Sequence, residues 1–270
     1  MTEVAQLSSR GRHVGRPTWA RALWAHGFFY SRVWKGSVTT SFLFPVLYLA
    51  AMGVGLGTLV DHHTHTVGGV RYLDFLAPGL LAGTILQVSV NESTYPVMAR
   101  IKWIRSYWAM LATPLSVRDV LIGHLGWAVI RGVMVSSIFL GVMAVFGAVH
   151  SVLAVLVVPV AMLASLAFAS PTTAFAATTS KENGFALLYR FGVIPLFLFS
   201  ATFFPLGQLP TAIRYLAQLT PLLHAVNLIR GLTLGRLVVV QNLFDLAYLI
   251  GFALLGCALA DRAFRKRLVV

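Results

Sequence analysis

The sequence predicts an all-α membrane protein with six transmembrane helices, an N-terminal interfacial helix and re-entrant outer helices before the last span. Only 11% of the 270 residues are charged, against about 25% in a typical soluble domain, and the mean hydropathy is +0.81. The charges also leave long gaps, since residues 36–60 contain none and residues 120–180 contain only Arg131. Both stretches exceed the roughly 20 apolar residues that cross a bilayer core.

Residues 1–36 are expected to form a cytoplasmic segment that contains the interfacial helix. Residues 18–35 read TWARALWAHGFFYSRVWK, in which aromatic residues alternate with Arg21, Arg32 and Lys35. Aromatic rings at headgroup depth and cations beside lipid phosphates are typical of a helix that lies in the membrane surface. The alternative is a basic flank that only anchors the first span. The length of this segment, and the further spans that follow, argue against a cleavable signal peptide.

Residues 37–262 are expected to form the membrane domain, and residues 263–270 a basic cytoplasmic tail. The prolines inside the expected spans are tolerated in membranes because neighbouring groups or local distortion satisfy the freed carbonyls. The six expected spans are residues 38–59, 75–99, 120–146, 152–179, 185–204 and 242–260.

Lysine and arginine predict the orientation of these spans. Sixteen of the 21 fall in the two terminal segments and in the second-to-third and fourth-to-fifth connections. Four lie on the opposite side, namely Arg71, Arg214, Arg230 and Arg236. Because cytoplasmic loops carry the excess of these residues, both termini are expected in the cytoplasm, with the chain in the cytoplasmic (inner) membrane. The same distribution explains the net charge of +13 without a nucleic-acid partner.

Motifs for nucleotide binding or covalent catalysis are missing from the sequence. No segment matches G-x-x-x-x-G-K-[ST] or G-x-S-x-G, so any energy from ATP must come from another chain. The single cysteine, Cys257, offers no disulfide or metal spacing. Residues 61–65 read DHHTH, but consecutive residues seldom arrange a tetrahedral site alone. We therefore expect a solvated loop there and no metal site.

Residues 100–118 form the second-to-third connection, which is short, basic and aromatic. It continues into the third span as RIKWIRSYWAMLATPLSVRDV over residues 100–120, with a helix stop at Thr113-Pro114. We expect a short surface helix followed by a turn. Such a protrusion can dock into a groove of a partner protein, and an ordinary interfacial loop is the alternative.

Residues 204–235 are apolar but broken by Pro205, Pro210 and Pro221. The pieces are too short to cross the membrane and return. We expect two short helices that dip into its outer half, where non-helical backbone must be covered by protein or water. A simple extracellular loop is the alternative.

Glu92 is a carboxylate inside the second expected span. A charge at the centre of a membrane costs roughly 2.5–3.5 kcal/mol on insertion scales and must be paired, wetted or protonated. Glu92 lies about 12 Å from the cytoplasmic end of its span, and Arg131 lies about 20 Å from the same end of the third span, at 1.5 Å per residue. A long arginine side chain can nearly close this offset. Glu92 therefore has either a structural role, in which it pairs with Arg131 or caps a distorted helix through Asn91 and Ser93, or a functional one, in which it faces a transport path together with Asn91 and Gln87.

Four ordered stretches make the chain resemble the permease subunit of type 2 ABC exporters, in the branch of nodulation lipo-oligosaccharide and polyketide-drug exporters. They read FLAPGLL at residues 75–81, NESTY at 91–95, AMLATPL at 109–115, and FPLGQLP at 204–210 with PLLHAVNLIR at 221–230. Together with the six-span layout they cover nearly the whole chain. One departure is Trp108, which stands where relatives often carry a glutamate.

The resemblance implies a permease that pairs with a second permease, identical or paralogous, and binds two cytoplasmic ABC ATPase subunits. ATP and Mg²⁺ would be held by the ATPase, and this chain would bind no cofactor. The substrate would be amphipathic, as a drug, glycolipid or lipo-oligosaccharide is. It would pass between the two permeases, past the first, second and fifth spans. The outer helices would close this path from outside, and residues 100–117 would contain the coupling helix that meets the ATPase.

The resemblance assigns roles to three groups of residues. The first group is a candidate substrate path, the second is the coupling segment and the third is the outer segment. The aromatic residues of the path, like Phe42, Phe44 and Tyr48, have lipid contact or packing as the alternative. The groups are, in that order, Gln87, Asn91, Glu92, Tyr95, Phe199, Phe203 and Phe204; Trp103, Arg105, Tyr107, Trp108, Met110, Leu111, Thr113 and Pro114; and Pro205, Pro210, Pro221, His224, Asn227 and Arg230.

Two other functions stay open at this point. An intramembrane enzyme acting on lipid-linked substrates would use His62, His63, His65 and Glu92, and it would work as a single chain without ATP. A self-sufficient secondary carrier would typically show inverted repeats, and none is visible in the sequence.

Overall fold

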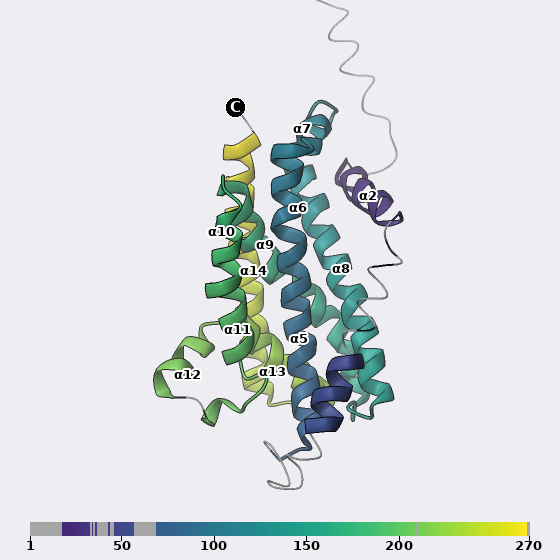
Figure 1. Cartoon of the computed structure of the whole chain (residues 1–270), viewed down its shortest axis with the longest axis vertical. Helices are drawn as coiled ribbons and strands as arrows, with labels where there is room; N and C mark the ends of the chain where they lie inside the picture. Colours follow the sequence, from purple (N-terminus) through teal and green to yellow (C-terminus); the bar gives the residue numbers. More distant parts are fainter. Residues whose placement is uncertain are drawn as a thin grey trace, which may run out of the picture.

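The computed structural model describes residues 18–32, 34, 36, 43, 46–56, 69–208 and 210–268, and nearly all of these residues are helical. Long helices run side by side, and short helices cap the bundle (Figure 1). α7 and the C-terminus lie at one end, which we call the α7 end, whereas α12 and α13 lie at the other, the α13 end. The helices between Thr18 and Leu111 are α2 Thr18–Tyr30, η1 Leu49–Leu56, α5 Tyr72–Ser93, α6 Tyr95–Met98, η2 Ala99–Trp103 and α7 Ser106–Leu111.

The second half of the chain supplies the other long helices and the elements of the α13 end. These helices are α8 Val117–Val145, η3 Val152–Leu156, α9 Val157–Thr178, α10 Asn183–Leu187, η4 Leu188–Val193, α11 Ile194–Phe199, η5 Leu206–Gln208, α12 Thr211–Gln218, α13 Pro221–Leu234 and α14 Val239–Leu268.

Four helical stretches are long and apolar enough to cross a membrane. They are Tyr72–Trp103, Val117–Val145, Val152–Thr178 and Val239–Leu268, and they correspond to the second, third, fourth and sixth expected spans. The expected all-helical membrane fold is therefore confirmed at this level. The fifth expected span is a shorter apolar helix, Asn183–Phe199, and the first is described only at residues 43 and 46–56. The count of six spans and the membrane depth of the outer helices stay predictions.

α9 is the central helix of the bundle, and its small residues let its neighbours approach closely. Ala161, Ala164 and Ala167 are fully buried, and α14 packs along α9 in the most extensive helix contact of the described chain. The contact is tight at Gly256, where a Cβ atom would lie 2.2 Å from Ser170 Oγ and 3.1 Å from the backbone nitrogen of Pro171. Small residues at such crossings are the usual way for membrane helices to pack, because lipid provides no hydrophobic force between them.

The long helix Tyr72–Trp103 is interrupted at Thr94, two residues after Glu92. Thr94 leaves helical geometry, with φ −103° and ψ −98°. Pro96 explains the break, because its ring collides with the carbonyl four residues earlier and it has no N–H to donate. Thr94 Oγ1 bonds to the carbonyl of Val90 at 3.0 Å, and the helix then resumes as α6 and the π-helical turn η2. The break places Glu92 beside a distortion and carries the helix on to Trp103.

α2 lies against α8 near the α7 end (Figure 1). The two backbones nearly touch at Gly123, where a Cβ atom would lie 2.6 Å from Ala22 Cβ and 2.9 Å from the Leu23 nitrogen. At the start of α8, Ser116 and Asp119 form a capping box, and Asp119 Oδ1 also accepts a hydrogen bond from Thr18 Oγ1 at 2.7 Å. The aromatic segment 18–35 is thus a helix over Thr18–Tyr30, fastened to the bundle at its first residue.

Candidate functional site

Glu92 and Arg131, which the sequence predicts to lie inside the second and third spans, lie together between α5 and α8. Arg131 Nε donates to Glu92 Oε1 at 3.0 Å, and Trp127 Nε1 donates to Glu92 Oε2 at 3.2 Å. The side chain of Arg131 is 11% exposed and that of Glu92 is 21% exposed. The carboxylate therefore has a cation and a neutral donor on its two oxygens.

α2 completes this ion pair from a third direction. Arg131 Nη1 donates to the Tyr30 hydroxyl at 2.8 Å, and the guanidinium carbon lies 4.6 Å from the centre of the Tyr30 ring. The Tyr30 ring also contacts that of Trp127, with centroids 5.3 Å apart. The pair thereby joins three helices at one point.

The other polar candidates of the second span, on α5 and α6, differ in exposure. Gln87 is half-buried, whereas Asn91 and Tyr95 are exposed. The Tyr189 hydroxyl of η4 donates to Asn91 Oδ1, and the Tyr95 ring meets Phe185 edge-on at 4.8 Å. Asn91 and Tyr95 therefore lie at a junction with the short apolar helix Asn183–Phe199, on the surface of this chain.

The three aromatic path candidates after η4 differ in exposure. Phe199 is 41% exposed and Phe204 is 55% exposed, whereas Phe203 is 8% exposed. The ring of Phe203 packs edge-on against Phe197 at 5.2 Å. Phe199 and Phe204 can contact lipid, a substrate or a partner, whereas Phe203 contributes mainly to packing. Phe42 and Phe44 lie outside the described residues.

The coupling segment contains the short helix α7, whose inward-facing side chains fix it to the rest of the bundle. Arg105 precedes it in the left-handed conformation, at φ 54°, which reverses the chain after η2. Tyr107 is fully buried, and Trp108 Nε1 donates to the carbonyl of Ile101 at 3.0 Å. These two aromatic side chains anchor α7, so Tyr107 has no surface to offer a partner.

Several expected coupling residues do face outward at the α7 end. Trp103 is 50% exposed and its neighbour Ile104 is 68% exposed. Arg105, Thr113 and Pro114 are exposed as well, while Met110 and Leu111 are half-buried. An apolar and cationic surface on a rigid protrusion suits contact with another protein.

Beneath α7 lies a cluster of titratable side chains from four elements. His26 of α2 contacts the Arg100 guanidinium at 2.5 Å, and its ring lies 5.7 Å from that of His124 in α8. His124 is fully buried, and neither of its ring nitrogens has a hydrogen-bond partner among the described residues. Burial, reinforced by the charge of Arg100, lowers the pKa of His26 to about 3. Burial also raises the pKa of Tyr107. His26 is therefore neutral at physiological pH.

At the α13 end, His224 is held by a carboxylate that the sequence analysis had overlooked. His224 Nδ1 lies 2.5 Å from Asp245 Oδ1, and its Nε2 lies 3.0 Å from the carbonyl of Gln218. Asp245 is fully buried, and Tyr248 stacks on the imidazole at 4.0 Å. This contact fastens α13 to α14. Pro221 is the first residue of α13, where proline fits because the N–H it lacks has no helical partner.

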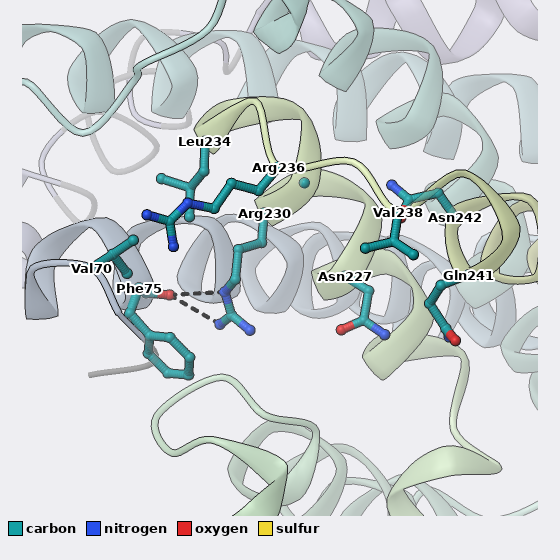
Figure 2. A pocket seen from close by; sticks show the side chains of 10 residues that line it. Val70, Phe75, Asn227, Arg230, Leu234, Arg236, Val238, Gln241 and Asn242 are labelled. Carbon is teal, nitrogen blue, oxygen red and sulfur yellow. Dashed lines mark hydrogen bonds between the residues drawn. The ribbon is translucent and has the colours of Figure 1, made fainter. Parts of the chain in front are cut away.

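Arg230 ties α13 to two other segments. Its Nη2 donates to the carbonyls of Phe75 and Ala201, both at 2.9 Å, and its guanidinium carbon lies 3.9 Å from the centre of the Phe75 ring. Figure 2 shows this side chain beside a cavity that Asn227 also lines. Pro205 and Pro210 belong to the non-helical links around η5.

Metal binding receives no support from the described residues, which contain no group of three or more histidine, cysteine, aspartate or glutamate side chains. Residues 61–65 lie outside the described part of the chain.

Comparison with known proteins points to one family. The pattern of the ABC-2 type transporter family matches residues 22–234, which is most of the chain. Nodulation protein J of Rhizobium meliloti (strain 1021) is 28% identical over 249 residues, covering 92% of this chain and 93% of the relative. Nodulation protein J of Rhizobium leguminosarum bv. viciae is 31% identical over 219 residues, covering 80% and 82%. That of Rhizobium leguminosarum bv. trifolii is 31% identical over 222 residues, covering 81% and 82%.

Proposed function

Because the chain belongs to the ABC-2 type transporter family, and is thus a multi-pass membrane component of an ABC transporter, we propose that it is the permease of an ATP-driven exporter. The observation that carries this proposal is the family match across residues 22–234. In this proposal the chain performs no covalent chemistry. Two separate ATPase subunits hydrolyse ATP, and two permeases, identical or paralogous, enclose the path of an amphipathic substrate.

In the proposed orientation the α7 end faces the cytoplasm. Arg100, Lys102 and Arg105 lie there, as do the three cations of the last turn of α14. The α13 end carries Arg71, Arg214, Arg230 and Arg236. The imbalance favours a cytoplasmic α7 end, because lysine and arginine accumulate in cytoplasmic loops. α12 and α13 would then lie on the outer side, as the re-entrant helices that close the path.

α7 is the proposed contact with the ATPase. The bond from Trp108 to Ile101 holds it on the helix Tyr72–Trp103, and its buried Tyr107 packs against His124 of α8 and Phe264 of α14. Force applied to the exposed Trp103 and Ile104 would therefore be transmitted to η2 and α6. Glu92 lies on α5, just before the break at Thr94, and is bonded to α8, so a movement of α7 would reach the ion pair across that break.

The path of the substrate is proposed to run along the exposed side of α5 and the helix Asn183–Phe199. Asn91 and Tyr95 supply polar groups there, and Phe199 and Phe204 supply exposed aromatic rings. A mixed polar and aromatic surface suits an amphipathic molecule, whose headgroup and apolar chain need different contacts. Glu92 is turned from this side toward Arg131 and Trp127, which supports a structural role for its carboxylate.

The experiment that tests the function is reconstitution. The tagged chain, purified from its native membrane in mild detergent, should bring down a P-loop ATPase, and the complex in liposomes should hydrolyse ATP. Trp103→Ala should reduce capture of the ATPase at least tenfold with unchanged thermal stability, because it removes an exposed aromatic at the end of η2, beside α7. Phe191→Ala, which removes an aromatic ring that is 71% exposed on η4, is the matched control. If the isolated chain moves substrate in liposomes without any ATPase, the proposal is wrong.

A further inference from the structure

A cavity of about 240 Å³ at the α13 end is lined by both apolar and hydrogen-bonding side chains. Its walls are the start of α5, the last turns of α13 with the link after it, and the first turn of α14 (Figure 2). Water occupies about 30 Å³ per molecule in the liquid, so the cavity has room for a small ion with bound water. The polar lining residues are Asn227, Arg230, Arg236, Gln241 and Asn242.

Arg230 presents a fixed positive charge to this cavity. Three hydrogen bonds from Nε and Nη2 to backbone carbonyls hold the guanidinium in place. Nη1 has no hydrogen-bond partner among the described residues, and the guanidinium lies between Phe75 and Asn227 in Figure 2. Backbone dipoles and one aromatic ring compensate a buried charge only in part.

Arg236 adds a second positive charge at the rim. It is exposed, and its Nη2 donates to the carbonyl of Gly69 at 3.3 Å. Neither Arg230 nor Arg236 has a carboxylate within 4.0 Å among the described residues, whereas Arg71 at the same end pairs with Asp74. Asp245 lies one turn beyond the lining residue Gln241, and it is already bonded to His224 and to the Gln241 amide. The cavity is therefore left positive.

Neutral donors point to the same kind of ligand. The Asn242 Nδ2 atom is buried and has no hydrogen-bond partner among the described residues. The first turn of the 30-residue helix α14 forms one wall, and its first N–H groups have no acceptor within the helix. The positive end of a helix favours an anion. The two guanidiniums and the helix N-terminus together suit a ligand that is rich in acceptor oxygens.

We propose that this cavity binds a tetrahedral oxyanion, phosphate or sulfate, in free form or as the headgroup of an anionic phospholipid in the leaflet at the α13 end. Nη1 of Arg230 and the Arg236 guanidinium donate charge-assisted hydrogen bonds to its oxygens. Val70, Leu234 and Val238 supply apolar walls beside them. The bound anion links α5, α13 and α14, and so stabilises the closed packing of the α13 end.

Two binding measurements test this proposal and separate the sources. In detergent with uncharged headgroups, titration calorimetry measures Kd for inorganic phosphate and sulfate, with chloride at equal ionic strength as the reference. In nanodiscs, the thermal midpoint is compared between pure phosphatidylcholine and a mixture with phosphatidylglycerol. Sulfate and phosphate stabilise folded proteins without binding, so only differences between variants count.

Arg236→Gln is the decisive variant, because this exposed side chain is not required for packing. It should raise the Kd for the anion at least tenfold, as expected for the loss of a charge-assisted hydrogen bond. Arg214→Gln removes one charge from α12 at the same end, outside the cavity, and should leave anion binding unchanged, although it loses the bond to the Gly207 carbonyl. Arg230→Lys, if it elutes as the wild type does, should also weaken binding, because lysine cannot keep both the carbonyl bonds and the free donor.

The outcomes assign the source or overturn the site. Calorimetric binding that Arg236→Gln weakens identifies a free oxyanion. A phosphatidylglycerol-dependent midpoint that Arg236→Gln abolishes, without calorimetric binding, identifies a lipid headgroup. If no measurement distinguishes Arg236→Gln from Arg214→Gln, the cavity is not an anion site.

Discussion

The ion pair between Glu92 and Arg131 should stabilise the fold by an amount that a double-mutant cycle can measure. Removing one partner of a buried pair costs about 3–5 kcal/mol, whereas an exposed pair is worth about 0–1 kcal/mol. The two side chains are 21% and 11% exposed, so they lie between these limits and closer to the buried one. We therefore expect Glu92→Gln to lower the free energy of unfolding by about 2 kcal/mol, and Arg131→Gln by a similar or larger amount, since it also loses Tyr30.

The cycle isolates the interaction. If the two side chains act mainly on each other, the double variant should lose about 1–2 kcal/mol less than the sum of the single losses. The assay is reversible unfolding of the purified chain in mixed micelles with increasing dodecyl sulfate, followed by tryptophan fluorescence. Glu182→Gln makes the same chemical change at an exposed carboxylate with no ion pair in the described chain, and should have no effect.

Additivity of the two single losses within about 0.5 kcal/mol would refute a stabilising pair. The same variants, reconstituted with the ATPase, separate structure from transport. A structural carboxylate predicts that transport falls only as far as the folded fraction does. If Glu92→Gln keeps its stability and loses transport, the carboxylate acts on the substrate instead.

Three further predictions concern the contacts of α2 and α13. The pKa of His26 is about 3 in the folded chain and about 6.5 when unfolded, so the unfolded chain binds the proton more readily. The contribution of His26 to stability should therefore be complete above about pH 6.5 and fall as the pH drops toward 3. Thermal midpoints measured from about pH 7.5 to 5 should show this fall, and His26→Gln should show a smaller one. Gly123→Ala should lower the free energy of unfolding by about 1–3 kcal/mol in the same micelle assay, because the added Cβ meets the backbone of α2. The control is Gly141→Ala, where the added Cβ has open space on the same helix, and equal effects would argue against the close approach. His224→Ala should lower the free energy of unfolding by about 2–4 kcal/mol, because it leaves Asp245 buried with only Gln241 as a partner. Adding Asp245→Asn should recover part of that loss. If the double variant instead loses the sum of the two single losses, the pairing is contradicted.

The pairing of Glu92 with Arg131 shows what the sequence could indicate. Counting residues from the cytoplasmic ends of the second and third spans placed Glu92 and Arg131 about 8 Å apart in depth, because the second span was taken to end near Arg100. The helix in fact continues to Trp103, which puts Glu92 about 16 Å from its end, and Arg131 lies about 21 Å into α8. The remaining offset is within reach of an arginine side chain, so residue counting was sufficient to find the partner.

The partners of this pair on other helices were beyond such counting. Tyr30 and Trp127 read as aromatic residues at a membrane surface or in a span, and no periodicity shows that they bond to Arg131 and Glu92. That information depends on how α2 crosses α8, which the close approach at Gly123 determines. Asp245 is a different case, because a carboxylate inside an apolar stretch is itself a signal of a buried partner. The same rule that singled out Glu92 would have predicted a partner for Asp245.

The bonds along α2 have one mechanical consequence. Thr18 is bonded to the first turn of α8, His26 to Arg100, and Tyr30 to Arg131 in the middle of α8. Attachment at both ends and near the middle leaves this helix no freedom to pivot on its own. When the transporter changes conformation, α2 and α8 should therefore move together as one rigid unit.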